Sequence, residues 1–305
     1  MPAAPRSGVT IQGRTPKLID GLDRLMESII PTSRLPGFRR LAIFLLGAIC
    51  LLLGLGATAE EIKIGGTGNA LGAMRLLAAA FNREHPAIQA RVLNSIGSSG
   101  AIKGVPKGAV DIGLSSRPLT DEEGAAGAVF TEYARTLTVL SVATKSQVRA
   151  ITREQIADIY SGHFHQWPDG TPIRPVLRQQ GDDNTRQLKT LSPAVEQALE
   201  AAEQRQGLPF AVTDQEAADK IESIPGAIGV TTLALIESET RSLRPLTLDG
   251  IEPRVENGVS GTYPLVKHFY LLTQPQPRAA VQDFIAFLRS PAGRSILIQS
   301  GHWLP

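Results

Sequence analysis

Three short apolar segments between residues 62 and 118 constrain the fold of this chain more than any other feature. They lie at 62–64, 91–96 and 110–114, and each leads into a Gly-rich or hydroxyl-rich turn: GGTGN, GSSG and SSRP. A helix can begin after each of the first two turns. Open α/β sheets bind ligands at the carboxyl ends of their strands, where helix-start N–H groups gather. The segments therefore predict an α/β fold that holds a small, anionic ligand.

The remainder of the chain alternates between strand-like and helix-like patterns. Further strands are expected at 137–144, 174–177, 226–230 and 268–273, and further helices at 152–160, 182–191, 196–206, 279–288 and 292–298. Thr152 and Gln155 have the spacing of a capping box, in which each side chain bonds the other residue's N–H. Strands that alternate with helices predict α/β lobes, each with a mainly parallel sheet flanked by helices.

Composition and charge exclude several classes of function. At 305 residues and 42% apolar content, the chain is long enough for two domains. Residues 60–305 carry 24 basic and 26 acidic side chains, so they present no strongly basic face suited to nucleic acid. The single cysteine, Cys50, precedes that region and excludes disulfides and cysteine-based metal sites there. His163 and His165 fit a solvated loop better than a metal site, and we expect no metal and no cofactor.

The first 59 residues have the pattern of a secretory leader. Three arginines precede the apolar run 41–57, and the small-x-small motif ATA ends at residue 59. Residues 34–59 therefore predict a cleavable signal peptide and a periplasmic location. The alternative is a membrane anchor at 41–57, since about 17 apolar residues is near the lower limit for a span. Residues 1–33 are interpreted as a non-native or disordered extension, with Met1 or Met26 as the true start.

A set of motifs runs in a characteristic order along the body of the chain. They are IGSSG at 96–100, VDIG at 110–113 followed by SSRPL, ITREQ at 151–155 leading to IYSG and Trp167, PGAIGV at 225–230, DG at 249–250, EN at 256–257, SGTYPL at 260–265 and SPAG at 290–293. Over most of residues 62–305 the chain resembles the phosphate-type substrate-binding proteins of ABC transporters, which have the type II periplasmic-binding-protein fold.

The resemblance implies two α/β lobes joined by two crossover segments, with an oxyanion clamped between them. Residues 60–143 and 241–305 would form lobe one, and residues 144–240 lobe two. The implied protein is a monomer that delivers its ligand to an ABC permease. The positions that match the family's ligand site are Thr67, Gly68, Asn69, Ala70, Ser98, Ser116, Arg117, Arg178, Asp183, Asn184 and Thr185.

Two departures from the family pattern bear on the ligand. Phosphate-specific members carry an aspartate where this chain has Ser116, and Arg117 follows it. The turn at 181–185 is one residue longer than the family's Gly-Ser-Gly-Thr and contains two aspartates. Asp183 could accept the phosphate proton from the opposite wall, or an aspartate there could cap its own helix. A ligand with both positive and negative groups is a third possibility.

The sequence leaves several functions open. The leading hypothesis is a non-enzymatic receptor for an oxyanion, with phosphate favoured. The alternative is a sensory or extracellular binding protein with an altered ligand, such as sulfate, a molybdate-like oxyanion or a small organic anion. A phosphate-ester hydrolase is disfavoured, because the sequence contains neither paired metal ligands nor an activated nucleophile.

Overall fold

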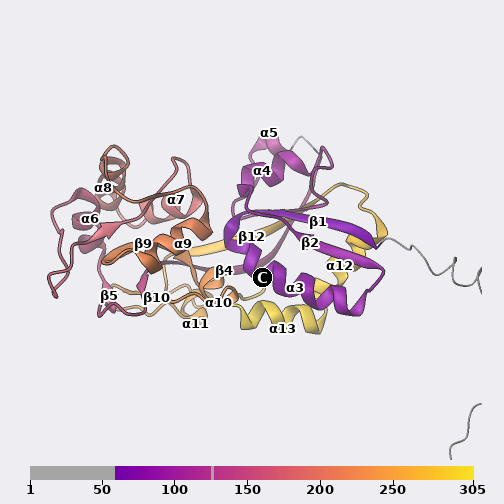
Figure 1. Ribbon diagram of the computed structural model, residues 1–305. Helices are drawn as coiled ribbons and strands as arrows, with labels where there is room; N and C mark the ends of the chain where they lie inside the picture. The colour runs from indigo at the N-terminus through magenta and orange to yellow at the C-terminus, as the bar shows by residue number, and fades with distance from the viewer. Residues whose placement is uncertain (1–58, 125–126) are drawn as a thin grey trace, which may run out of the picture. The chain divides into compact units, whose positions relative to one another are not determined.

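The computed structural model describes residues 59–124 and 127–305, and Figure 1 shows their arrangement. The predicted extension at 1–33, the anchor at 41–57, the choice of start residue and all but the last residue of the signal peptide lie outside this part. Within it, the helices are too short or too polar to cross a membrane. Residues Thr58–Pro305 form one compact unit.

A mixed eight-stranded sheet runs through the described residues. Its strand order is β2-β1-β3-β12-β4-β9-β6, with β10 beside β4. The pairs β1–β2, β1–β3 and β6–β9 are parallel, whereas β12 and β4 run antiparallel to their neighbours. Two small parallel pairs, β5–β11 and β7–β8, complete the set. The strands are β1 Glu60–Gly66, β2 Ile88–Val92, β3 Ile112–Ser115, β4 Val129–Ala143, β5 Ala150–Ile151, β6 Arg174–Pro175, β7 Leu177–Arg178, β8 Phe210–Ala211, β9 Ala227–Thr232, β10 Leu243–Pro245, β11 Thr247–Leu248 and β12 Val266–Thr273.

Helices flank the sheet on both sides, as expected for an α/β fold (Figure 1). They are α3 Gly68–Glu84, α4 Gly97–Gly104, α5 Asp121–Gly124, α6 Arg153–Ser161, α7 Asp183–Lys189, α8 Pro193–Glu203, α9 Asp214–Ser223, α10 Leu233–Ser238, α11 Val255–Val259, α12 Ala279–Arg289 and α13 Pro291–Gln299. The predicted capping box is confirmed: Gln155 N donates to Thr152 Oγ1 at 3.2 Å, and Thr152 N donates to Gln155 Oε1 at 3.0 Å.

The predicted strand at 91–96 was placed too late in the chain. The observed strand β2 is Ile88–Val92, whose pairing with β1 starts at Ile88. Its outer edge is bonded by Asn82 of α3, which accepts from Ala90 N at 2.7 Å and donates to Ala90 O at 3.0 Å. Beyond the strand the chain bends so that Ile96 N donates to Gly66 O at 3.1 Å. This bend ends the strand and carries the following residues toward the end of β1.

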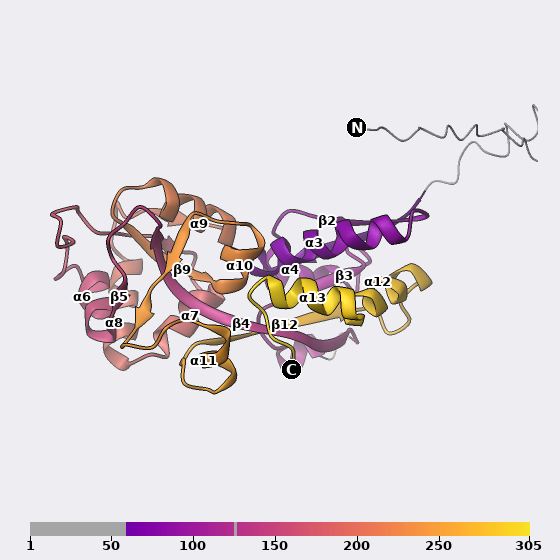
Figure 2. The same ribbon diagram turned by 90° about the horizontal axis from the view of Figure 1, so that it is seen from below.

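Two large apolar cores give the protein its two lobes. One core is formed by β1, β3, α3, α12 and α13, and the other by β9 and helices α6 to α9. The long strands β4 and β12 contribute to both and pass from one to the other (Figures 1 and 2). The second core also contains Leu243 and Leu265, from the stretch that the sequence assigned to lobe one. The bounds expected for the lobes, 60–143 with 241–305 for one and 144–240 for the other, stay a prediction.

Candidate functional site

A cleft of about 320 Å³ opens where the predicted turns converge. One side, here called the first wall, is formed by Thr67, Asn69, residues 95–99 and residues 116–117. The other side, the second wall, is formed by residues from 178 to 186 and from 212 to 214. Of the predicted site residues, the cleft lining contains Thr67, Asn69, Ser98, Ser116, Arg117, Arg178 and Asp183. It does not contain Gly68, Ala70, Asn184 or Thr185, which lie behind it.

The first wall depends on a close approach between the ends of β1 and β3. Thr67 N donates to Leu114 O at 3.0 Å, directly after β1 ends at Gly66. A Cβ atom on Gly66 would lie 2.0 Å from that same Leu114 oxygen, so only glycine fits. Thr67 is the N-cap residue of α3, yet its hydroxyl makes no capping bond. The Thr67 hydroxyl and the start of the 17-residue helix α3 therefore lie at the cleft, which Thr67 and Asn69 line.

Helix α4 supplies the second half of this wall. Its N-cap is Ile96, which has no side chain able to cap the helix. Ser98 Oγ accepts from Ser116 N at 3.1 Å and lies 3.3 Å from Ser116 Oγ, so the structure brings these two predicted residues together. Helices α6, α7, α8, α9, α10 and α13 begin with a side-chain cap, whereas α11 and α12, like α3 and α4, do not. Neither helix of the first wall is capped by its own N-cap residue, although Asn69 N of α3 donates to Asp214 Oδ2 at 3.1 Å from the other wall.

Arg117 lines the cleft but its guanidinium is held by the protein. Its Nη1 and Nη2 atoms donate to Glu123 at 2.7 and 2.8 Å, and Nη2 also donates to Ser99 Oγ at 3.1 Å. The hydrogen bond from Arg117 lowers the pKa of Glu123 to about 2. The bond to Glu123 likewise raises the pKa of Arg117.

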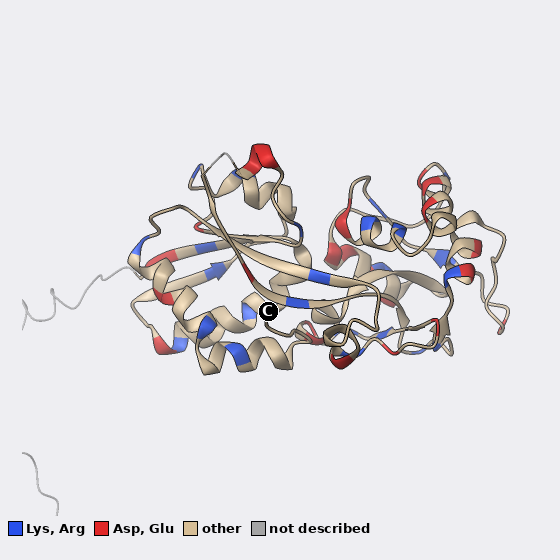
Figure 3. Cartoon of the chain, turned by 180° about the vertical axis from the view of Figure 1, so that it is seen from behind, with Lys and Arg blue, Asp and Glu red and all other residues tan. Residues whose placement is uncertain are grey.

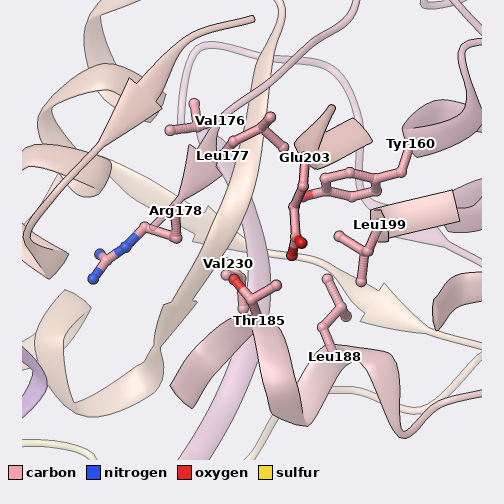
Figure 4. Close-up of a pocket in the computed structure, with 9 residues that line it drawn as sticks. All are labelled: Tyr160, Val176, Leu177, Arg178, Thr185, Leu188, Leu199, Glu203 and Val230. Atoms are coloured by element: carbon pink, nitrogen blue, oxygen red, sulfur yellow. The ribbon is translucent and has the colours of Figure 1, made fainter. Parts of the chain in front are cut away.

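Arg178 is the buried cation of the second wall, with only 4% of its side chain exposed. Its Nη2 atom donates to Asp182 Oδ1 at 2.9 Å, and its Nη1 atom lies 3.0 Å from Asp214 Oδ1. Among the described residues, neither its Nε nor its Nη1 atom makes a hydrogen bond, so the contact of Nη1 with Asp214 is an ion pair only. Figure 4 shows the side chain extending from β7 away from the apolar group around Leu188 and Leu199. A buried donor of this kind is suited to a bound anion.

The two aspartates of the 181–185 turn have different roles. Asp182, and not Asp183, caps α7, because its Oδ2 accepts from Thr185 N at 3.0 Å. Asp183 pairs with Arg186 at 2.9 Å and with the fully buried Lys267. Burial opposes the ionisation of Asp183, but Lys267 and Arg186 outweigh it and lower its pKa. Both of its oxygens are engaged, and the idea that it accepts a ligand proton stays a prediction.

Sequence reasoning missed Asp214 and Lys267. Asp214 is 6% exposed; its Oδ2 accepts from Asn69 N at 3.1 Å and its Oδ1 from Asn184 Nδ2 at 3.1 Å. Asn69 Nδ2 donates to Asn184 Oδ1 at 3.2 Å, and Thr232 Oγ1 donates to Asn69 Oδ1 at 3.1 Å. Burial raises the pKa of Asp214 in spite of the opposing charge of Arg178. The predicted residues Asn69 and Asn184 thus join a buried network in which Asn69 and Asp214 line the cleft.

A signal for Asp214 was present in the sequence. Thr213 and Glu216 have capping-box spacing, and Thr213 Oγ1 does accept from Glu216 N at 3.1 Å to start α9. No pattern in the sequence indicated that Lys267 is buried, because a lysine within an apolar strand is normally expected at the protein surface. The described residues contain no cluster of His, Cys, Asp and Glu that could hold a metal ion.

Comparisons with known proteins agree with this architecture. The curated relatives include the phosphate-binding proteins PstS of Bacillus subtilis and Borreliella burgdorferi. The first is 22% identical over 75% of this chain and 76% of its own length, and the second 26% identical over 67% and 76%.

Solved structures give the same picture. A protein described as a phosphate ABC transporter substrate-binding protein from Clostridium perfringens, solved with bound phosphate, is 25% identical with a TM-score of 0.67. The match covers 81% of this chain and all of that one. The periplasmic molybdate-binding protein of Azotobacter vinelandii, 14% identical, shares the fold over 80% of this chain and all of its own, with a TM-score of 0.57. Residues 54–292 match the PBP superfamily domain. This chain therefore belongs to the PBP superfamily of two-lobed binding proteins.

Proposed function

We propose that this protein is a periplasmic solute-binding receptor that captures an oxyanion, with phosphate favoured, and delivers it to an ABC permease. One observation carries the proposal: the starts of α3 and α4, neither capped by its own N-cap residue, and the buried Arg178 line the same cleft. Helix starts present N–H groups and the positive end of the helix dipole, and both favour a bound anion. Arg178 adds a charged donor from the opposite wall.

Hydroxyl groups complete the set of donors that a buried oxyanion needs. Thr67, Ser98 and Ser116 line the cleft, and Thr67 and Ser116 are 4% and 5% exposed. A hydroxyl can donate to the anion and still accept a bond from the protein. The phosphate-binding relatives support phosphate as the first ligand to test. Binding by closure of two lobes requires no bond to be made or broken, so we propose no enzymatic activity.

The surroundings of the cleft support transport of a small solute by a single chain. Basic and acidic residues are interspersed along the chain in Figure 3, without the concentration of basic residues that a nucleic-acid-binding protein has. We propose that the protein acts as a monomer without nucleic acid. We also propose that residues 34–59 direct it to the periplasm and are removed there.

One observation favours a second candidate, a sensory or extracellular binding protein with a different ligand. The cations around the cleft are paired with carboxylates: Arg117 with Glu123, Arg178 with Asp182 and Asp214, and Arg186 with Asp183. A cleft with balanced charges is also compatible with sulfate, a molybdate-like oxyanion or a small organic ion that carries both signs.

A thermal-shift panel distinguishes the two candidates. The purified protein is heated with phosphate, sulfate, molybdate or small organic phosphates, and shifts are followed up by titration calorimetry. A ligand at 100 times its dissociation constant stabilises the folded state by about 2.7 kcal/mol. We expect the largest shift with phosphate. A larger shift with another ligand would favour the second candidate, and no shift with any of them would contradict the proposal.

A further inference from the structure

We infer that the Asp214 carboxylate is an internal competitor of the ligand: it occupies anion donors of the cleft and must release them when an oxyanion binds. This inference rests on the proposed function and concerns how that site is regulated. Its basis is a single side chain that contacts both of the features that make the cleft suited to an anion. These features are the start of α3 and the Arg178 guanidinium.

The first step is the position of the carboxylate. Asp214 Oδ2 accepts from Asn69 N at 3.1 Å, and Asn69 is the second residue of α3. A carboxylate at this place satisfies a helix-start donor and interacts with the positive end of the helix dipole, as a bound oxyanion would. Asp214 Oδ1 lies 3.0 Å from Arg178 Nη1. The ligand and Asp214 therefore need the same donors.

The second step is the balance of charge around Asp214. The charged groups that face it are Arg178 from β7, Asp182 at the start of α7 and Lys267 from β12. Lys267 is bonded to Asp183, and Arg178 is shared with Asp182. An additional buried anion would thus enter a set of cations that already have partners, which is unfavourable. When Asp214 withdraws, the positive charge of Arg178 is less fully neutralised and can interact with the bound anion.

The third step is the packing beneath the carboxylate. A Cβ atom on Gly68 would lie 2.7 Å from Asp214 Oδ2 and 2.5 Å from Gln215 Oε1, so the start of α9 rests directly on the start of α3. Gln215 Nε2 also donates to Gly68 O at 2.9 Å. Withdrawal of Asp214 requires these two helix starts to shift relative to each other. Competition for the anion donors is thereby coupled to movement of one wall against the other.

The competition gives a pH dependence with a defined sign. Burial raises the pKa of Asp214 above its ordinary value, so the folded protein protonates it more readily than a solvated aspartate. As pH falls, the neutral side chain holds Asn69 N–H and Arg178 less strongly, and the anion binds more tightly. Asp214→Asn imitates the protonated state at every pH.

The test is a phosphate titration of the wild-type protein, Asp214→Asn and Asp182→Asn by calorimetry. We expect Asp214→Asn to bind phosphate about tenfold more tightly than wild type at neutral pH, which corresponds to about 1.4 kcal/mol. Asp182→Asn is the matched control, because it removes the other carboxylate on Arg178 but leaves the Asn69 N–H bonded. Equal tightening by both variants would mean that charge alone is responsible and would overturn the inference.

The same titrations are repeated at several pH values. Phosphate ionises identically in both experiments, so the ratio of the wild-type and Asp214→Asn dissociation constants reports only on the protein. As pH falls and Asp214 becomes protonated, the ratio of wild-type to Asp214→Asn dissociation constants should fall toward one. A constant ratio would contradict the inference. Phosphate binding that is unchanged or weaker in Asp214→Asn would contradict it while leaving the proposed function intact. Failure of the wild-type protein to bind any anion would contradict the proposed function.

A wild-type measurement keeps the inference testable if Asp214→Asn fails to fold. The NMR resonance of the Asn69 backbone N–H should follow the ionisation of Asp214 in phosphate-free protein. In phosphate-saturated protein this pH dependence should disappear, because the N–H has exchanged its carboxylate partner for the ligand. An identical pH dependence in both samples would overturn the inference.

Discussion

The first wall of the cleft and the second wall satisfy their polar groups in different ways. In the first wall, two helices begin without side-chain caps, and the polar side chains around them are mostly hydroxyls. In the second wall, α7 and α9 begin with capped N–H groups, and buried charges are joined in pairs between Arg178, Asp182 and Asp214. The first wall presents backbone N–H donors, and the second wall presents the Arg178 charge, which is already paired with Asp182 and Asp214.

This difference separates geometry from charge as sources of affinity. The donors at the start of α4 are held by the backbone and need no reorganisation when an anion arrives, whereas Asn69 N of α3 must exchange its Asp214 partner for the anion. The charge of the second wall has to be redistributed, because Arg178 is bonded to the protein's own carboxylates. Substitutions in the first wall should therefore act through backbone position, and substitutions in the second wall through electrostatics.

The largest expected effect tests the backbone geometry of the first wall. Gly66→Ala places a methyl group 2.0 Å from Leu114 O, where only backbone movement can make room. We expect the free energy of unfolding to fall by about 3 kcal/mol or more, measured by urea denaturation. Gly97→Ala is the control: its φ is +69° but its Cβ meets no atom within 4 Å, so the loss should be about 1 kcal/mol. Equal losses would show that the close approach is unimportant.

The next effect tests the charge of the second wall. Arg178→Gln removes a 4% exposed guanidinium, and we expect phosphate affinity to fall about 100-fold in calorimetry. Arg186→Gln is matched in charge and also lines the cleft, but 52% of its side chain is exposed and solvent screens it. Its affinity should fall by about threefold or less. Similar losses in both variants would mean that net charge, and not the buried donor, decides binding.

The same contrast explains how much of the site the sequence could predict. The first wall is made of local motifs, and Thr67, Ser98 and Ser116, which the strand and turn patterns and the family resemblance predict for the site, do line the cleft. Their contact with a ligand stays a prediction. The second wall depends on pairs that are distant in sequence, such as Asp183 with Lys267 and Arg178 with Asp214. The sequence pattern does not specify which carboxylate pairs with which cation when the two lie 36 or 84 residues apart. The pairing emerges only when the strands and helices pack together.

The fold was predictable for a related reason. Strand–helix alternation is a local signal, and β9, β12, α12 and α13 lie where the sequence placed them. The antiparallel contacts of β4 and β12 were not predictable, because the residue pattern of one strand does not specify the direction of the strands beside it.

A smaller effect tests the hydroxyls of the first wall. Ser98→Ala removes the acceptor of Ser116 N and a hydroxyl that lines the cleft, and phosphate affinity should fall about tenfold. Ser99→Ala is the control at the same helix start, since Ser99 is exposed and its Oγ accepts from Arg117 at 3.1 Å. We expect its affinity to fall by about threefold or less in the same titration. A larger loss for Ser99→Ala would place the anion nearer to Arg117 than to Ser116.

The smallest effect compares two carboxylates whose pKa values shift in opposite directions. Arg117 lowers the pKa of Glu123 from 4.5 to about 2, so ionised Glu123 stabilises the folded state above about pH 4.5. This contribution is lost as pH falls toward 2, and because Glu123 is partly exposed it should be below about 1 kcal/mol. Asp214 has a raised pKa, so its ionisation costs stability as pH rises.

Urea denaturation of Glu123→Gln should therefore show a lower free energy of unfolding than wild type at neutral pH, and the difference should vanish near pH 2. Glu122→Gln, the exposed neighbour, should match the wild type throughout. A stability difference that grows as pH falls would mean that Glu123 is stabilised in its protonated form. In that case both walls would carry carboxylates poised to lose their charge, and the contrast between a wall of fixed donors and a wall of shared charge would not hold.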